Sequence, residues 1–142
     1  MKDCEFFPTE TINGVEIDNF TRHYIFCALW SSTDNSDESG GEPLDRNHNI
    51  HDLPTETLKQ MKEDCDNFRQ HEGVPELIEQ AGEMRDYPEA AAGHDFWLTR
   101  NGHGAGFWGR DLGEVGDKLS NIAKTFGSAD LYIGDDGKVY HF

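Results

Sequence analysis

Three turn signals built around glycine divide this chain, and they constrain its fold more than any other feature. Asn13-Gly14 and Asn101-Gly102 are dipeptides that favour two-residue hairpin turns, and Gly134-Asp135-Asp136-Gly137 marks a third turn. Apolar residues flank each turn, which predicts a β-hairpin at each position. The aromatic and apolar segment 23–30 is interpreted as a buried strand, although its periodicity leaves a short helix open.

Three amphipathic helices are predicted between these turns. The first is capped by Asp52, has Pro54 in its first turn and ends at Gly73, and the second opens at Pro75. The third is capped by Asp111 and ends at Gly127. The apolar residues of the first helix recur at steps of three and four, which places them on one face: Leu58, Met61, Cys65 and Phe68.

The order strands, two helices, hairpin, helix, hairpin predicts an α+β fold. We expect a mainly antiparallel sheet built from hairpins, with about three helices packed on one face. Because 142 residues suit one domain, we expect residues 1–142 to form a single α+β domain. Residues 31–49 are polar, acidic and rich in Ser and Gly, which predicts a mobile acidic loop within it.

The net charge of the chain restricts the classes of macromolecule that it can bind. Against 12 Lys and Arg stand 28 Asp and Glu, which gives a net charge of −16. Nucleic acid and anionic membranes should repel such a chain, whereas a basic protein that normally binds nucleic acid should attract it. The sequence has no apolar run long enough for a membrane span and no signal-peptide core at its start, so neither is expected.

Acidic residues in the loop and in the first two predicted helices are the candidate partner-binding surface. A line of carboxylates there would imitate the charge of nucleic acid and attract a basic groove. Solvated faces that keep the protein soluble are the plainer interpretation of the same residues. The predicted set is Asp34, Asp37, Glu38, Glu42, Asp45, Glu63, Asp64, Asp66, Glu76, Glu79 and Glu83.

A second candidate is the glycine-rich turn near residue 101. Its candidate functional loop comprises His94, Asp95, Arg100, Asn101 and His103. Imidazole serves as a general base or metal ligand, and turn amides hold anions. The glycine spacing matches no phosphate loop, however, and the histidine spacing matches no standard zinc pattern. A purely structural hairpin turn is the alternative, and we assign no catalytic residue, metal or cofactor.

The cysteines and most of the aromatic residues are expected to lie in the hydrophobic core. Cys4, Cys27 and Cys65 form no CxxC pair, which favours buried thiols in a reducing compartment. Most of the tryptophans and tyrosines lie in predicted strands, and one or two of them are candidates for exposed anchors at a partner interface.

Two segments carry a resemblance to a known group of proteins. Tyr24–Ser32 and His94–Trp108 resemble small acidic proteins encoded by tailed bacteriophages and prophages, and the similarity covers about residues 20–142. The resemblance implies a small phage protein made in the cytoplasm of the bacterial host. It carries over no activity and no functional residue. Small acidic phage proteins include inhibitors of restriction enzymes, CRISPR complexes and host polymerases.

These observations lead to one main hypothesis and two alternatives. The main hypothesis is a phage accessory protein, not an enzyme, that binds and inhibits a basic host protein that handles nucleic acid. The first alternative is a small enzyme or a metal- or ligand-binding protein that uses the His94–His103 region. The second is a virion or assembly component. The sequence leaves the oligomeric state open.

Overall fold

The computed structural model describes residues 9–34, 42–46, 48–84, 87–102, 106–107 and 112–141. Its helices are α2 (Asn19–Ser31), α3 (Thr55–Gln70), α4 (Val74–Met84), α5 (Glu89–Arg100) and α6 (Glu114–Lys124). Its 3₁₀ turns are η1 (Leu44–Arg46) and η2 (Ile50–Asp52). Its strands form antiparallel pairs: β1 (Glu10–Ile12) with β2 (Val15–Ile17), β3 (Thr33–Asp34) with β4 (Glu42–Pro43), and β5 (Leu131–Ile133) with β6 (Val139–His141).

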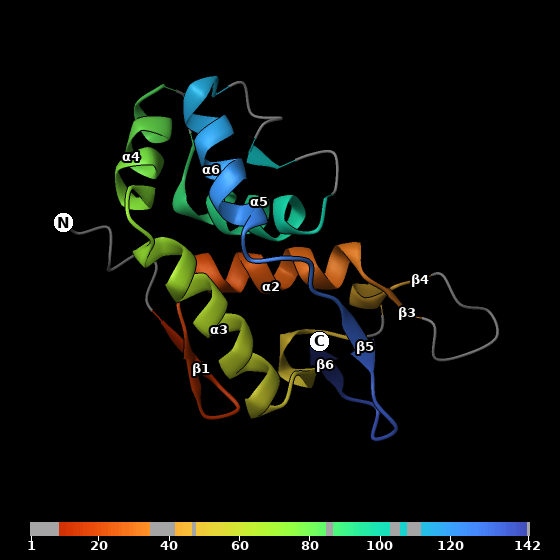
Figure 1. Cartoon of the computed structure of the whole chain (residues 1–142). Coiled ribbons are helices and arrows are strands. Elements are labelled where there is room, and N and C mark those ends of the chain that lie inside the picture. The colour runs from red at the N-terminus through yellow and green to blue at the C-terminus, as the bar shows by residue number, and fades with distance from the viewer. Residues whose placement is uncertain are drawn as a thin grey trace.

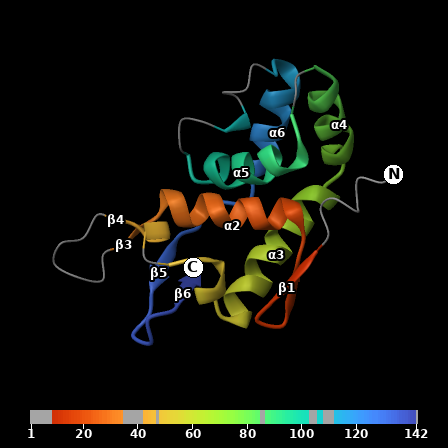
Figure 2. The same ribbon diagram turned by 180° about the vertical axis from the view of Figure 1, so that it is seen from behind.

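The predicted α+β fold with a mainly antiparallel sheet is therefore wrong. The described residues are mostly helical, and their strands form two-stranded pairs that do not join into a larger sheet. Helix α2 crosses the middle of the molecule (Figures 1 and 2). Helices α4, α5 and α6 lie on one side of it, and α3 lies with the strand pairs on the other. The core is thus built mainly from helix contacts across α2.

Helix α2 replaces the strand predicted over residues 23–30. It begins after Asp18, whose side chain accepts a hydrogen bond of 2.9 Å from the backbone N–H of Thr21. Eight of its 13 residues are buried, because α5, η1 and α3 pack against it. A helix that is covered on several sides has no broad polar face, so its sequence lacks the helical period. Its aromatic and β-branched residues then resemble a strand.

Helix α5 replaces the hairpin predicted around Asn101-Gly102. Asn101 is the C-cap of α5 with φ −96°, and Gly102 follows with φ +74°, the left-handed conformation that ends many helices. At Asn13-Gly14 the two φ angles are both positive, +48° and +82°, and the predicted hairpin forms there between β1 and β2. The same dipeptide therefore serves two different turns.

Gly93 brings α5 close to α2. A Cβ atom added at this position would lie 2.2 Å from the backbone oxygen of Phe20, so only glycine allows the two helices to approach this closely. The aromatic core extends from this contact. The rings of Phe68 and Phe96 stack with centroids 4.2 Å apart, and the ring of Tyr24 lies 5.1 Å from that of Phe96. Both helix contacts and ring stacking therefore hold α2, α3 and α5 together.

The remaining elements agree more closely with the sequence. Helices α3 and α4 are confirmed, and the buried face of α3 is the predicted apolar stripe. The predicted cap of α3 is wrong, because Pro54 is its N-cap and Asp52 lies in η2. The last hairpin is confirmed as β5 and β6. Helix α6 is also confirmed, but it begins after Gly113, and its predicted cap Asp111 lies outside the described residues.

Parts of the predicted loop 31–49 are ordered segments. Ser31 ends α2, and β3, β4 and η1 lie within the range. Residues 35–41 and 47 lie outside the described part of the chain. Cys27 and Cys65 are buried as predicted, whereas Cys4 is not described. None of the described helices has the length and apolar character that a membrane span needs.

Candidate functional site

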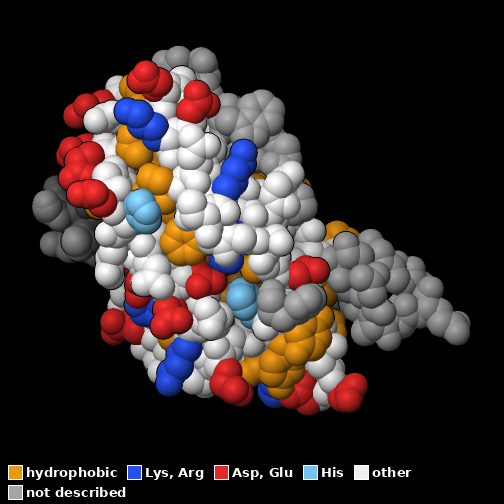
Figure 3. Space-filling model, viewed as in Figure 1, with side chains coloured by type: hydrophobic (Ala, Val, Ile, Leu, Met, Phe, Trp, Pro, Cys, Tyr) orange, Lys and Arg blue, Asp and Glu red, His pale blue; other side chains and the backbone are white. Residues whose placement is uncertain are grey.

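The acidic residues of α4 gather on its outer side. Glu76, Glu79 and Glu83 are exposed, and their spacing of three and four residues places them on one face. We call these three residues the α4 acidic face. Figure 3 shows acidic side chains crowding the edge of the molecule that α4 forms. None of the three carboxylates forms an ion pair with a described residue, and α4 contains no Lys or Arg. The face is an uncompensated line of negative charge.

The acidic residues of α3 are used differently. Asp66 accepts hydrogen bonds from Lys62 at 2.8 Å and from Arg69 at 2.8 Å. Arg69 also donates to Asp18, the cap of α2, at 2.6 Å. Burial raises the pKa of Asp18, but hydrogen bonds from Thr21 and Arg69 outweigh it, and the net pKa is lowered. These charges therefore join α3 to the start of α2.

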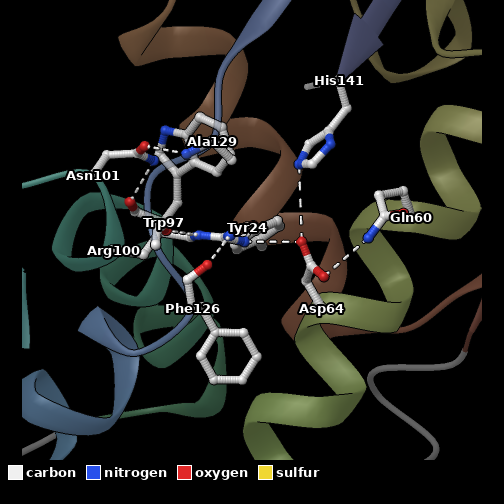
Figure 4. Close-up of polar contacts among 10 residues, drawn as sticks. Tyr24, Gln60, Asp64, Trp97, Arg100, Asn101, Phe126, Ala129 and His141 are labelled. Atoms are coloured by element: carbon white, nitrogen blue, oxygen red, sulfur yellow. Dashed lines mark hydrogen bonds and ion pairs between the residues drawn. The ribbon is translucent and has the colours of Figure 1, made fainter.

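Asp64 turns inward to Arg100 of α5. Its Oδ2 accepts a hydrogen bond of 2.9 Å from Nη1 of Arg100, and its Oδ1 accepts one of 3.1 Å from Gln60 (Figure 4). The side chain of Arg100 is 6% exposed and that of Asp64 is 14% exposed. Glu63, the neighbour of Asp64, is exposed. Of the three acids predicted on α3, the structure thus places one on the open surface and two in internal ion pairs.

Arg100 connects four parts of the molecule. Its guanidinium also donates to the hydroxyl of Tyr24 at 2.8 Å, and to the carbonyls of Phe126 at 2.9 Å and Gly127 at 2.8 Å, just after α6 (Figure 4). Burial lowers the pKa of Arg100, but Tyr24 and Asp64 outweigh it and raise the net value. A guanidinium that makes these four hydrogen bonds holds α2, α3 and α5 to the segment after α6, and it leaves little hydrogen-bonding capacity for a ligand.

His141 of β6 completes this group, which we call the buried charge cluster: Tyr24, Asp64, Arg100 and His141. The Nε2 atom of His141 lies 3.8 Å from Oδ2 of Asp64 and makes no hydrogen bond with a described residue. Burial lowers the pKa of His141; the charge of Asp64 raises it and that of Arg100 lowers it again, and the net pKa is lowered. The fold therefore favours the neutral imidazole.

The predicted functional loop separates into two parts, because its residues 94–100 belong to α5. Successive residues of a helix are about 100° apart, so Asp95 and Arg100 point about 140° away from each other. Asn101 is turned to the chain after α6, where it accepts a hydrogen bond of 2.7 Å from the N–H of Ala129. His103 lies outside the described residues. The described members of the loop do not converge on one pocket.

His94 and Asp95 form the other part. Nδ1 of His94 lies 3.2 Å from Oδ1 of Asp95, and the buried carboxylate of Asp95 accepts a hydrogen bond of 2.7 Å from the hydroxyl of Tyr87. Cys27 lies near Asp95, and burial together with the negative charge of Asp95 raises the pKa of the thiol to about 12. A thiol with that pKa is a poor nucleophile at neutral pH. Within the described part of the chain, no group of three or more His, Cys, Asp or Glu is arranged to hold a metal ion.

The loop acids are described only in part. Asp45 is exposed in η1, and the backbones of Asp34 and Glu42 pair between β3 and β4. Asp37 and Glu38 lie outside the described residues.

The aromatic residues divide between the core and the surface. Trp97 is buried and donates a hydrogen bond of 2.8 Å to Ser31, whereas Trp30 is 56% exposed and Tyr132 is 45% exposed. Trp108 is not described.

Comparison with protein families, with curated proteins and with solved structures finds no match to this chain. The site must therefore be interpreted from its own geometry. Sequence reasoning named Asp64 and Arg100 but did not connect them, and it missed Tyr24 and His141 as their neighbours. These residues come from four elements far apart in the sequence, so no local spacing could have indicated the cluster.

Proposed function

We propose that this chain is a non-catalytic acidic protein that binds a basic protein surface through the α4 acidic face and blocks it. The observation that carries this proposal is the difference in ion pairing. Several of the described arginines and lysines are committed internally, among them Arg22, Lys62, Arg69 and Arg100, while the carboxylates of α4 have no cationic partner among the described residues. One face of an outer helix therefore presents three exposed carboxylates, and that helix carries no Lys or Arg to offset them.

The natural target of such a face is a protein that normally binds nucleic acid. Grooves that bind nucleic acid are lined by Lys and Arg, and opposite charges speed association and exclude wrong partners. The net charge of −16 strengthens the attraction at long range. The resemblance to small acidic phage proteins supports a host protein as the target, in the cytoplasm of an infected bacterium. A defence complex or a polymerase fits this description.

The spacing of the carboxylates limits how closely α4 can imitate DNA. Residues three and four apart on a helix rise by about 4.5 and 6 Å, whereas one DNA strand carries a charge every ~3.4 Å of axis. Helix α4 is only 11 residues long, so it offers a short and sparser line of charge. We therefore propose attraction to a basic surface rather than a copy of the shape of a duplex.

Capture from a bacterial lysate tests this function. The tagged protein is incubated at about 0.05 M salt and washed at about 0.5 M, because exposed charges are strongly screened at the higher value. We expect it to retain a nucleic-acid-binding protein at low salt and to release it at high salt. The captured protein is then assayed for binding to its nucleic acid with and without this chain. Capture of no such protein, or capture without competition, would refute the proposal.

A further inference from the structure

An open groove of about 690 Å³ lies between α4 and α6, directly beside the α4 acidic face. Its lining comes from the turn before α4, from α4 and from α6: Glu72, Glu76, Leu77, Lys118, Asn121 and Ile122. Hydrophobic side chains are visible in Figure 3 between the acidic edge over α4 and a basic side chain over α6. The groove thus joins an apolar floor to an acidic wall.

The floor and the wall have different chemistry. Leu77 and Ile122 provide the apolar surface, and they come from the two helices that flank the groove. Glu72, in the turn before α4, and Glu76, in the first turn of α4, are both exposed and line the α4 side of the groove. Lys118 is exposed on the α6 side and forms no ion pair with a described residue. A bound segment must therefore satisfy two carboxylates and tolerate one ammonium group.

We infer that this groove receives a basic amphipathic segment of the partner, with an apolar side chain on Leu77 and Ile122 and a Lys or Arg beside Glu72 and Glu76. Charge complementarity selects this occupant. A purely apolar segment leaves both carboxylates without a partner, and a purely basic segment leaves the apolar floor exposed to water. The inference rests on the proposed function, because it names the part of the basic partner that the acidic side of α4 recognises.

A substitution at Lys118 should strengthen binding of the basic segment without destabilising the protein. Lys118→Glu replaces the unfavourable ammonium with a third carboxylate at the groove. Lys124→Glu changes the net charge equally on the same helix, but Lys124 does not line the groove. Both lysines are exposed, so neither change disturbs the core. Comparing the two variants distinguishes a contact made in the groove from the effect of a change in net charge.

Fluorescence anisotropy with two synthetic peptides tests the inference. One peptide forms a helix with Leu on one face and Lys and Arg on the other, and the second has Gln in place of each Leu. We expect the Leu peptide to bind at least about tenfold more tightly, as burial of one Leu side chain predicts. We expect Lys118→Glu to tighten its binding about threefold to tenfold relative to Lys124→Glu. The methyl resonances of Leu77 and Ile122 should shift on binding, and that of the distant core residue Ile12 should not.

The outcomes distinguish the groove from the proposed function. Equal affinities for the two peptides, together with equal effects of Lys118→Glu and Lys124→Glu, would contradict the inference that the groove binds the segment. If the groove is excluded in this way but Glu79→Gln and Glu83→Gln still weaken binding of the peptides, the α4 acidic face remains the binding surface and only the groove is refuted. Loss of affinity on changing Glu72 and Glu76 to Gln, greater than on changing Glu79 and Glu83, supports the groove. Failure of both peptides to bind would overturn the inference and count against the proposed function.

Discussion

Helices α3 and α4 are consecutive, amphipathic and rich in acids, yet the fold pairs two of the four carboxylates of α3 with described cations and none of those of α4. On α3, Asp64 and Asp66 pair with cations from α5 and from α3 itself. On α4, all three glutamates face outward without an ion pair among the described residues. The difference follows from position, because α3 packs against α2 and two strand pairs, whereas α4 lies at the edge on α3 and α6 (Figure 1). A count of acids therefore says little about where free charge lies.

The largest effect on stability is expected from removing the ion pair between Asp64 of α3 and Arg100. Asp64→Ala leaves the guanidinium of Arg100 buried without its counter-ion, which should lower the free energy of unfolding by about 3–5 kcal/mol. Glu63→Ala, at the exposed neighbouring position, should change it by about 0.5 kcal/mol or less. Urea denaturation measures both. A loss below about 1 kcal/mol for Asp64→Ala would mean that the buried charge cluster does not hold the helices together.

The second prediction compares Gly93, at the contact of α5 with α2 in the core, with Gly82 of the outer helix α4. Gly93→Ala forces a Cβ atom to within 2.2 Å of the Phe20 oxygen, so overpacking should destabilise the protein by about 1–3 kcal/mol. At Gly82 of α4, the added Cβ would be 3.6 Å from the oxygen of Tyr87, an ordinary contact. Gly82→Ala should therefore raise stability by up to about 1 kcal/mol through helix propensity. Equal and small effects would contradict the close approach of α2 and α5.

The third prediction concerns pH. Because the pKa of folded His141 lies below its ordinary value of 6.5, the unfolded chain takes up this proton first as the pH falls. The contribution of His141 should therefore be constant above about pH 7 and should reduce stability below pH 6.5. An NMR titration should give His141 a pKa below 6.5, and His141→Asn should flatten the loss of stability in that window. A pKa above 6.5 would show that attraction to Asp64 outweighs burial and the charge of Arg100.

The smallest expected effect on stability is on α4. Like charges three and four residues apart repel weakly on a helix, so Glu76→Gln/Glu79→Gln/Glu83→Gln should leave the free energy of unfolding unchanged or raise it within about 0.5 kcal/mol. Thermal denaturation at low salt measures this. A marked loss would indicate that the three carboxylates have structural partners, and the contrast with α3 would fail.

The sequence predicted correctly those helices and hairpins that have one buried face and one face exposed to solvent. The stripe of Leu58, Met61, Cys65 and Phe68 identified α3, and the turns at Asn13-Gly14 and 134–137 identified two hairpins. Helices α2 and α5 were not predictable by the same rule, because neighbours cover them on several sides and remove the alternation of polar and apolar residues. Their packing against each other, through Gly93, depends on residues about 70 positions apart.

The candidate site was predictable only in part. The sequence does contain a signal that separates the two helices: Lys59, Lys62 and Arg69 alternate with acids on α3, whereas α4 has no basic residue. Interleaved charges indicate local neutralisation. The pairing of Asp64 with Arg100 joins α3 to α5 across 36 positions, so no local pattern could predict it. The groove beside α4 also requires the placement of α6.

One comparison of affinities tests the central claim most directly. The partner captured by the protein is titrated with the wild type, with Glu76→Gln/Glu79→Gln/Glu83→Gln, and with Glu16→Gln/Glu56→Gln/Glu63→Gln. The two variants remove the same charge, but the second changes exposed acids of β2 and α3. We predict that the α4 variant loses at least about tenfold in affinity at low salt, while the other loses little beyond the general change of charge. Equal losses in the two variants, or none in the α4 variant, would contradict the account.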